Sequence, residues 1–145
     1  MNKGQIAKEY FKQGYNCAQS TAMAFAKEIN MTPEMIAKLT IGYGGGMGRM
    51  REVCGSISGV AFVLSALYGD KPKNDVYKMV QDVSDEFKRE NGSIVCRELL
   101  GLSKDEPITH IAEKRTEEYY RKRPCADLVE IAANALEKYL KELNA

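Results

Sequence analysis

Apolar residues recur along most of this chain at intervals of three and four positions, which is the period of an amphipathic helix. The stretch 74–90 shows the pattern clearly, with Val76, Val80, Val83 and Phe87 on one side. Strict alternation of apolar and polar residues, which is typical of β-strands, is scarce. The pattern therefore predicts an all-α protein.

Capping and turn residues divide the pattern into six to eight helices. Asn16 and Thr32 are expected N-caps, because their short polar side chains accept hydrogen bonds from first-turn amides, and Gly14 is expected to end a helix. The expected helices span residues 4–13, 17–26, 33–41, 54–68 (starting between 51 and 54), 74–90, 94–100, 107–123 and 124–143. No linker or internal repeat is evident, so we expect one compact helical bundle over residues 1–145.

A glycine-rich run, residues 42–48, separates the third and fourth expected helices. Five glycines in seven positions cannot hold a regular helix. We expect the amides of Gly44, Gly45, Gly46 and Gly48 to face a ligand, either an anion or a sulfur atom. The run lacks the Lys-Ser/Thr pair of a phosphate-binding P-loop, and no predicted strand precedes it, which argues against a dinucleotide-binding turn.

A second small-residue feature begins at Gly55, four positions before Gly59. The two glycines share one face of the expected helix 54–68. Such a face lets another backbone or a bulky ligand come close, so Gly55 is also a candidate cofactor-binding residue. The same face could pack a second subunit, which makes a homodimer an open alternative.

The chain contains four cysteines, and no two of them form a CxxC motif. They are Cys17, Cys54, Cys96 and Cys125. Three are expected at or near helix N-termini, where free amides and the helix dipole stabilise an anion. A thiolate is both the nucleophile and the metal ligand, and such a position lowers the pKa of a thiol. We therefore expect the fold to collect the four sulfurs in one pocket beside the glycine loop.

Composition narrows the functional classes. Lys and Arg number 21 against 20 acidic residues, so the net charge of +1 argues against a nucleic-acid-binding protein. No apolar run approaches the length of a membrane span, and the N-terminus has no signal-peptide core. A cytoplasmic location is the expectation, where thiols stay reduced unless they bind metal or cycle during turnover.

Three functions remain open on these residues. In the first, all four cysteines bind an iron–sulfur cluster or another metal and transfer electrons to an unidentified redox partner protein; around one shared metal, the sulfurs would lie roughly 3.5–4 Å apart. In the second, two thiols cycle between dithiol and disulfide without metal, as in an oxidoreductase or a redox sensor. In the third, a four-cysteine zinc ion stabilises an interaction module. The single histidine, His110, argues against Cys2His2 sites, and the absence of CxxCH argues against covalent haem.

The cysteine order and the glycine run resemble a known family. The features are Asn16-Cys17-Ala18, the run 42–48, the segment 54–59 (CGSISG), and then Cys96 and Cys125. These resemble the C_GCAxxG_C_C family of redox-active proteins, which is related to a domain of split-Soret cytochrome c. The resemblance covers roughly residues 5–140 and implies a redox or metal site built from the four cysteines. Ser56 stands where the family usually has alanine after the Cys-Gly pair.

Overall fold

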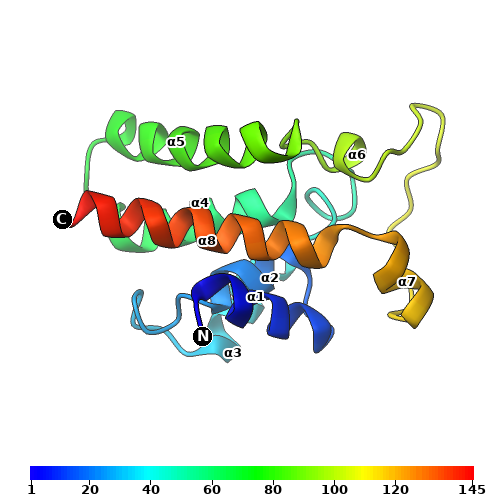
Figure 1. Cartoon of the computed structure of the whole chain (residues 1–145), viewed down its shortest axis with the longest axis horizontal. Helices are drawn as coiled ribbons and strands as arrows, with labels where there is room; N and C mark the ends of the chain where they lie inside the picture. Colours follow the sequence, from blue (N-terminus) through cyan, green and yellow to red (C-terminus); the bar gives the residue numbers. More distant parts are fainter.

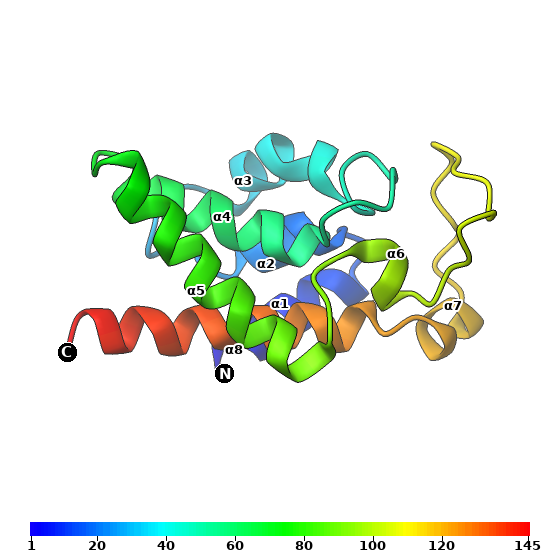
Figure 2. The same ribbon diagram turned by 90° about the horizontal axis from the view of Figure 1, so that it is seen from above.

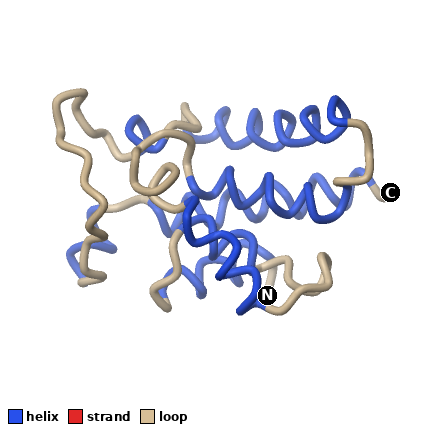
Figure 3. Tube along the Cα trace, turned by 180° about the vertical axis from the view of Figure 1, so that it is seen from behind, coloured by secondary structure: helices blue, strands red, loops and turns tan.

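A computed structural model describes all 145 residues of the chain. It contains eight α-helices, one short 3-10 helix and no β-strand, which confirms the predicted all-α class (Figure 3). The helices are α1 (Lys3–Lys12), α2 (Cys17–Met23), α3 (Pro33–Thr40), α4 (Gly55–Tyr68), α5 (Lys73–Asn91), α6 (Cys96–Leu99), α7 (Glu117–Lys122) and α8 (Cys125–Leu143); the 3-10 helix η1 spans Ile41–Tyr43.

Local capping explains several helix starts. Asn2 and Asn16 each accept a hydrogen bond from the amide three residues later, and the glutamine at that position bonds back to the cap amide. These reciprocal bonds satisfy two otherwise free donors at each start. Thr32 caps α3 through a single bond, in which its side chain accepts from the amide of Met35, and Pro33 is the first residue of the helix. The predicted caps Asn16 and Thr32 are therefore confirmed.

Two expected helices are much shorter than predicted. Helix α2 ends at Met23, and the chain continues through residues 24–30 in tight turns. The expected helix 107–123 is helical only over Glu117–Lys122. Residues 102–116 form an irregular strap instead, because Pro107 and three nearby β-branched residues disfavour helix.

Helix α4 lies at the centre of the bundle. It packs against α2, α5 and α8, while α1 lies along α8. In Figure 1, α5 lies on one side of α4 and α8, and α1, α2 and α3 lie on the other. Figures 1 and 2 both place α6, α7 and their connecting segments at one end of the bundle. At that end α4 and α8 begin, so their N-termini face the same region.

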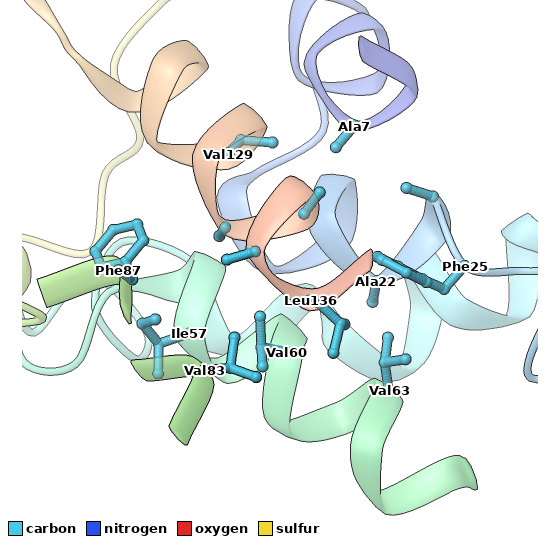
Figure 4. Packing of buried hydrophobic residues seen from close by; sticks show 14 of the residues in the cluster. Ala7, Ala22, Phe25, Ile57, Val60, Val63, Val83, Phe87, Val129 and Leu136 are labelled. Atoms are coloured by element: carbon cyan, nitrogen blue, oxygen red, sulfur yellow. The ribbon is translucent and has the colours of Figure 1, made fainter. Parts of the chain in front are cut away.

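The core is apolar and continuous through the bundle. Phe25, Val60, Val63 and Leu136 are fully or almost fully buried where α2, α4 and α8 meet (Figure 4). Phe87 of α5 joins the same cluster. Burying each such side chain contributes roughly 1.5–3 kcal/mol to folding, so the core fixes the helix starts that carry the cysteines.

The face of α4 that carries Gly55 and Gly59 packs against helix α2 of the same chain. A β-carbon placed on Gly59 would lie 2.9 Å from the carbonyl oxygen of Ala18 and 3.0 Å from Cβ of Thr21. The predicted close approach is thus made by α2, and this face is not free to receive a second subunit. No helix of the chain combines the length and apolar character that crossing a bilayer requires.

Candidate functional site

All four cysteines lie at the beginnings of helices. Cys17 is the first residue of α2 and Cys125 the first residue of α8. Cys54 is the N-cap of α4. Cys96 begins α6, whereas the sequence pattern predicts it inside a helix starting at residue 94. Each thiol therefore occupies a position fixed by the packing of its helix.

Backbone pairing brings Cys54 and Cys96 together. The amide of Cys54 donates to the carbonyl of Ile94 at 2.8 Å, and the amide of Cys96 donates to the carbonyl of Glu52 at 2.6 Å. An isolated antiparallel bridge joins Val53 to Val95 between them. Two short extended segments thus align the start of α4 with the start of α6.

Helix packing brings Cys17 beside the same helix start. A β-carbon on Gly55 would lie 3.1 Å from Cβ of Cys17 and 3.1 Å from the amide nitrogen of Ala18. Gly55 therefore lets the first turn of α2 approach the first turn of α4. Its predicted role in cofactor binding is untested, but its structural role in placing Cys17 is clear.

One cavity of about 490 Å³ is lined by all four cysteines. Gly44, Gly45, Gly46 and Gly48 line it as well, and so does Gly55. The structure thus gathers the predicted site residues around a common space, with the glycine loop as one wall. Their roles as redox thiols, metal ligands and cofactor-binding residues remain predictions.

The glycine loop has an unusual left-handed backbone. Residues 45–49 all have positive φ, including the non-glycine residues Met47 (68°) and Arg49 (60°). The amides of Gly48 and Arg49 donate to the carbonyls of Gly42 and Gly44 at 2.8 and 3.1 Å. These two amides are satisfied within the loop, and the role of Gly48 in cofactor binding remains a prediction.

Three other glycines of the loop, Gly44, Gly45 and Gly46, lie where a β-carbon would clash with a neighbouring residue. A β-carbon on Gly46 would lie 2.7 Å from Cβ of Cys96 and 2.6 Å from the amide nitrogen of Glu52. Only a residue without a side chain allows the loop to lie against the α6 cysteine. The left-handed conformation of Met47 and Arg49 costs roughly 1–2 kcal/mol per residue, a strain that is typical of functional sites.

The surroundings of the four thiols shift their pKa values in different directions. Cys17 and Cys125 hydrogen-bond to each other, which raises the pKa of Cys17 well above its usual value and lowers that of Cys125. Burial raises the pKa of Cys54 to about 11 and also raises that of Cys96. The expectation that a helix N-terminus lowers the pKa concerned Cys17, Cys54 and Cys125. It fails for Cys17, where the interaction with Cys125 dominates, and for Cys54, where desolvation dominates. The pKa of Cys125 is lowered, as expected, although the contact with Cys17 is the main cause.

Positive charge surrounds the sulfurs. Arg51 donates from Nη1 to Sγ of Cys96 at 3.7 Å. Arg115 and Arg123 line the same cavity, and with Arg51 their charges contribute to the lowered pKa of Cys125. Thiolates are anions, so these guanidinium groups favour the deprotonated sulfur that metal binding and nucleophilic attack both require.

The strap 102–116 closes one side of the cavity. His110 and Glu113 of the strap both line it. Arg49 donates to the carbonyl of Thr109 at 2.7 Å and pairs with Glu113 at 3.5 Å, and Arg123 also pairs with Glu113. Arginine contacts, rather than a helix, hold this segment over the thiols.

Arg115 fastens the end of the strap to α1. It donates to the carbonyl oxygens of Phe11 and Tyr15 at 2.9 and 3.0 Å. Its guanidinium also lies 4.1 Å from the centre of the Phe11 ring. The side chain satisfies carbonyls at the C-terminal end of α1 while it stacks on an aromatic ring.

The cysteines do not surround a single point. No group of three or more His, Cys, Asp or Glu side chains is arranged so that it could hold one metal ion. The predicted tetrahedral arrangement around one shared metal, with sulfurs roughly 3.5–4 Å apart, is therefore not found. The four thiols instead face a space much larger than one ion.

Comparison with known families agrees with this geometry. Residues 15–139 match the model of a family described as "Putative redox-active protein (C_GCAxxG_C_C)". The chain belongs to this family. The match of this C_GCAxxG_C_C protein spans all four cysteines and the glycine loop, which line the cavity. No curated protein and no solved structure matches the chain significantly.

Several residues of the site are not indicated by the sequence pattern. Arg115 and Arg123 line the cavity, although nothing in the pattern assigns either of them a role there. His110, which is exposed, lines the cavity as well. The only available signal was the density of arginine and aromatic residues in 115–123, and that pattern does not reveal which side chains turn inward.

Proposed function

We propose that this C_GCAxxG_C_C protein uses its four cysteines to bind an iron–sulfur cluster and transfers electrons to another redox protein. The observation that carries the proposal is the single cavity. The only four cysteines of the chain, separated by tens of residues, line it together from four helix starts. Four thiolates are the usual ligand set of an iron–sulfur cluster.

The donor set and the space suit a cluster better than a lone ion. Thiolates are soft ligands that select iron–sulfur clusters, zinc and copper(I). One small ion would need the sulfurs around one point, which the structure does not provide. A cluster has several metal atoms, so its ligating sulfurs lie farther apart, in keeping with a cavity of about 490 Å³. When bound, such a cluster would accept and donate single electrons.

A buried hydroxyl supports the assignment of Cys54 as a ligand. The Oγ atom of Ser56 is fully buried and has no hydrogen-bond partner in the reduced protein. Its hydroxyl and backbone amide both lie where they can donate to a thiolate at Cys54, which favours that thiolate. A metal-bound sulfur at Cys54 would supply the missing acceptor, and hydrogen bonds to ligating sulfur tune the reduction potential.

The burial of two thiols and the positive charge of the cavity would both favour a bound cluster. Cys54 is 4% exposed and Cys96 is 8% exposed, so water has little access to those two sulfurs. The arginines around the cavity offset the negative charge of ligating thiolates. The chain therefore provides ligands, partial exclusion of water and compensating charge in one place.

The test is metal analysis of protein purified without oxygen. We expect iron and acid-labile sulfide in similar amounts, together with a visible absorption spectrum that bleaches on reduction. Each of Cys17→Ser, Cys54→Ser, Cys96→Ser and Cys125→Ser should lower the iron content, whereas Ser65→Ala, at an exposed position of α4, should not. Colourless, iron-free protein from such a preparation would contradict the proposal.

A metal-free dithiol is the second candidate, and the Cys17–Cys125 pair is the observation that favours it. The two side chains hydrogen-bond and their pKa values shift in opposite directions. In this scheme the Cys125 thiolate attacks a disulfide of a partner protein and releases one partner sulfur as thiolate. Cys17, after losing its proton, then attacks Cys125, which releases the second partner sulfur and leaves a Cys17–Cys125 disulfide.

Mild oxidation separates the two candidates. The dithiol scheme predicts loss of two hydrogen atoms per chain, with peptide mapping that links Cys17 to Cys125 and leaves Cys54 and Cys96 free. Thiols that oxidise slowly and independently would exclude it. The zinc-module alternative has no specific support, since no set of ligands gathers around one ion.

A further inference from the structure

The wall of the thiol cavity carries an excess of positive charge. Four arginines line it, namely Arg49, Arg51, Arg115 and Arg123, and Glu113 is the only carboxylate among the lining residues. Four positive charges less one negative charge leave an excess of +3 from the arginines and Glu113. Electrostatic potential in a cavity with low-dielectric walls is focused, so this excess attracts anions.

Three of the four arginines already have strong partners. Arg49 and Arg123 share the carboxylate of Glu113. Arg115 donates to two backbone carbonyls and stacks on Phe11. These side chains hold the strap against the rest of the protein, and their guanidinium groups are already paired with protein groups.

Arg51 is different. Its side chain pairs with no carboxylate and makes one hydrogen bond, the 3.7 Å contact from Nη1 to Sγ of Cys96. Its backbone is fixed at φ 63°, with its amide donating to the carbonyl of Gly45 at 3.1 Å. The glycine loop therefore holds this guanidinium at the cavity wall with most of its five N–H donors unused.

The rest of the wall limits the chemistry of a ligand. Phe11, Leu99, Leu100 and Leu128 contribute apolar surface. A volume of about 490 Å³ falls within the range of small-molecule sites, which are mostly apolar with a few fixed polar groups. A guanidinium matches carboxylate and phosphate groups through paired hydrogen bonds.

From these observations we propose that the cavity binds a small organic oxyanion, a carboxylate or phosphate ester with an apolar body, whose charged group is held by Arg51 beside Cys96. The oxyanion would occupy the metal-free cavity, because the metal centre proposed above uses the same space. Its binding does not require that the cysteines ligate metal. It would place an apolar group against the leucines and an anionic group within reach of the thiols.

The test is a titration of the full-length protein, purified anaerobically, with its metal content recorded, and then freed of metal. The probes are benzoate, phenyl phosphate, inorganic sulfate and neutral benzyl alcohol. Binding is followed by calorimetry and by NMR shifts of the Gly44–Gly46 amides. We expect saturable binding of the two aromatic anions, about tenfold or more tighter than that of benzyl alcohol, with sulfate also weaker.

Variants at position 51 separate this site from a general attraction to positive charge. Arg51→Gln should weaken binding of benzoate and phenyl phosphate by about tenfold or more, and Arg51→Lys by less. Arg89→Gln, on the exposed surface of α5, should leave binding unchanged. Circular dichroism checks the fold of each variant, and the comparison of anionic with neutral probes on the native chain stands even if a variant unfolds.

Three outcomes would overturn the proposal. The first is an absence of saturable binding by either aromatic anion. The second is equal binding by the native chain and a folded Arg51→Gln variant. The third is sulfate binding as tightly as phenyl phosphate, which would exclude a contribution from the apolar wall. Because metal content is measured on the same samples, failure of this proposal is distinguishable from failure of the cluster proposal.

Discussion

Gly46 lies against Cys96 so closely that a β-carbon at position 46 would be 2.7 Å from the β-carbon of the cysteine. The loop also holds Gly46 at φ 73°. Gly46→Ala therefore adds a steric clash to the cost of a left-handed conformation. We expect it to lower the free energy of unfolding by roughly 2–4 kcal/mol, measured by urea denaturation.

A matched control for that substitution is Gly101→Ala. Gly101 has a similar φ of 68°, and nothing lies within 4 Å of the position of its β-carbon. It should show only the conformational cost, roughly 1–2 kcal/mol. Equal losses in both variants would mean that contact with Cys96 does not constrain the loop.

The Cys17–Cys125 bond predicts an order of thiol reactivity in metal-free, reduced protein. The pKa of Cys125 is lowered and that of Cys17 is raised. Since the thiolate is the reactive form, Cys125 should be alkylated by iodoacetamide faster than Cys17 as pH rises through neutrality. Cys17→Ala, which removes the donor, should raise the pKa of Cys125 and slow its alkylation at pH 7, as followed by mass spectrometry.

The comparison variant for this experiment is Cys54→Ser, which retains the Cys17–Cys125 pair. It should leave the reactivity of Cys125 nearly unchanged. Faster alkylation of Cys17 than of Cys125 in the native chain would contradict the assigned direction of the two pKa shifts.

Burial of Cys54 predicts a loss of stability at alkaline pH in the metal-free protein. Its pKa rises from 9.0 to about 11 on folding, and desolvation is the main cause. The stabilising contribution of the protonated thiol is complete below pH 9 and is lost as pH rises towards 11. The loss from this group should reach about 3 kcal/mol.

Other groups titrate in the same range, so the informative quantity is the difference between the native chain and Cys54→Ala. Unfolding free energies at pH 8 and pH 11 give the slope for each protein. The variant is less stable at pH 8 because it leaves a small cavity, but its further loss at pH 11 should be smaller. Parallel slopes would show that Cys54 does not titrate in the folded state as described.

The pairing of Glu113 with Arg49 and Arg123 predicts that charge controls the strap 102–116. Glu113 is 42% exposed, so its ion pairs are partly screened by solvent. Glu113→Gln should increase amide hydrogen exchange in the strap by about two- to fivefold, which corresponds to less than 1 kcal/mol. High salt should produce a similar increase in the native chain.

Glu117→Gln is the control for the strap. Glu117 lies in the first turn of α7 and forms no ion pair in the structure. Its substitution should leave exchange in the strap unchanged. If Glu113→Gln also has no effect, backbone contacts and Arg115 alone are sufficient to hold the segment.

Much of the fold follows from local signals that the sequence displays. Asn16 and Thr32 are short polar residues directly before helical patterns, and each caps the helix expected of it. The common pocket of the four cysteines is predicted from two local features, the position of thiols near helix starts and the glycine run 42–48. Packing of the core brings these features together.

The parts that could not be predicted depend on tertiary contacts. The strap 102–116 has helical spacing in places, but it follows an irregular path. Arg49 and Arg123 from other segments contact it, and its own Arg115 bonds to Phe11. The raised pKa values of Cys17, Cys54 and Cys96 come from burial and from neighbouring sulfur. Neither quantity can be read from spacing along the chain.

The location of every cysteine at a helix start has a consequence for biogenesis. Cys125 is the first residue of α8, and α8 packs against α1, α2, α4 and α5. The fourth thiol therefore joins the other three only when α8 has docked on the bundle, and any cofactor that requires all four needs that helix in place. A chain truncated before α8 would retain three thiols and lose the helix that carries Cys125. Completion of the four-cysteine site is therefore coupled to folding of the whole bundle.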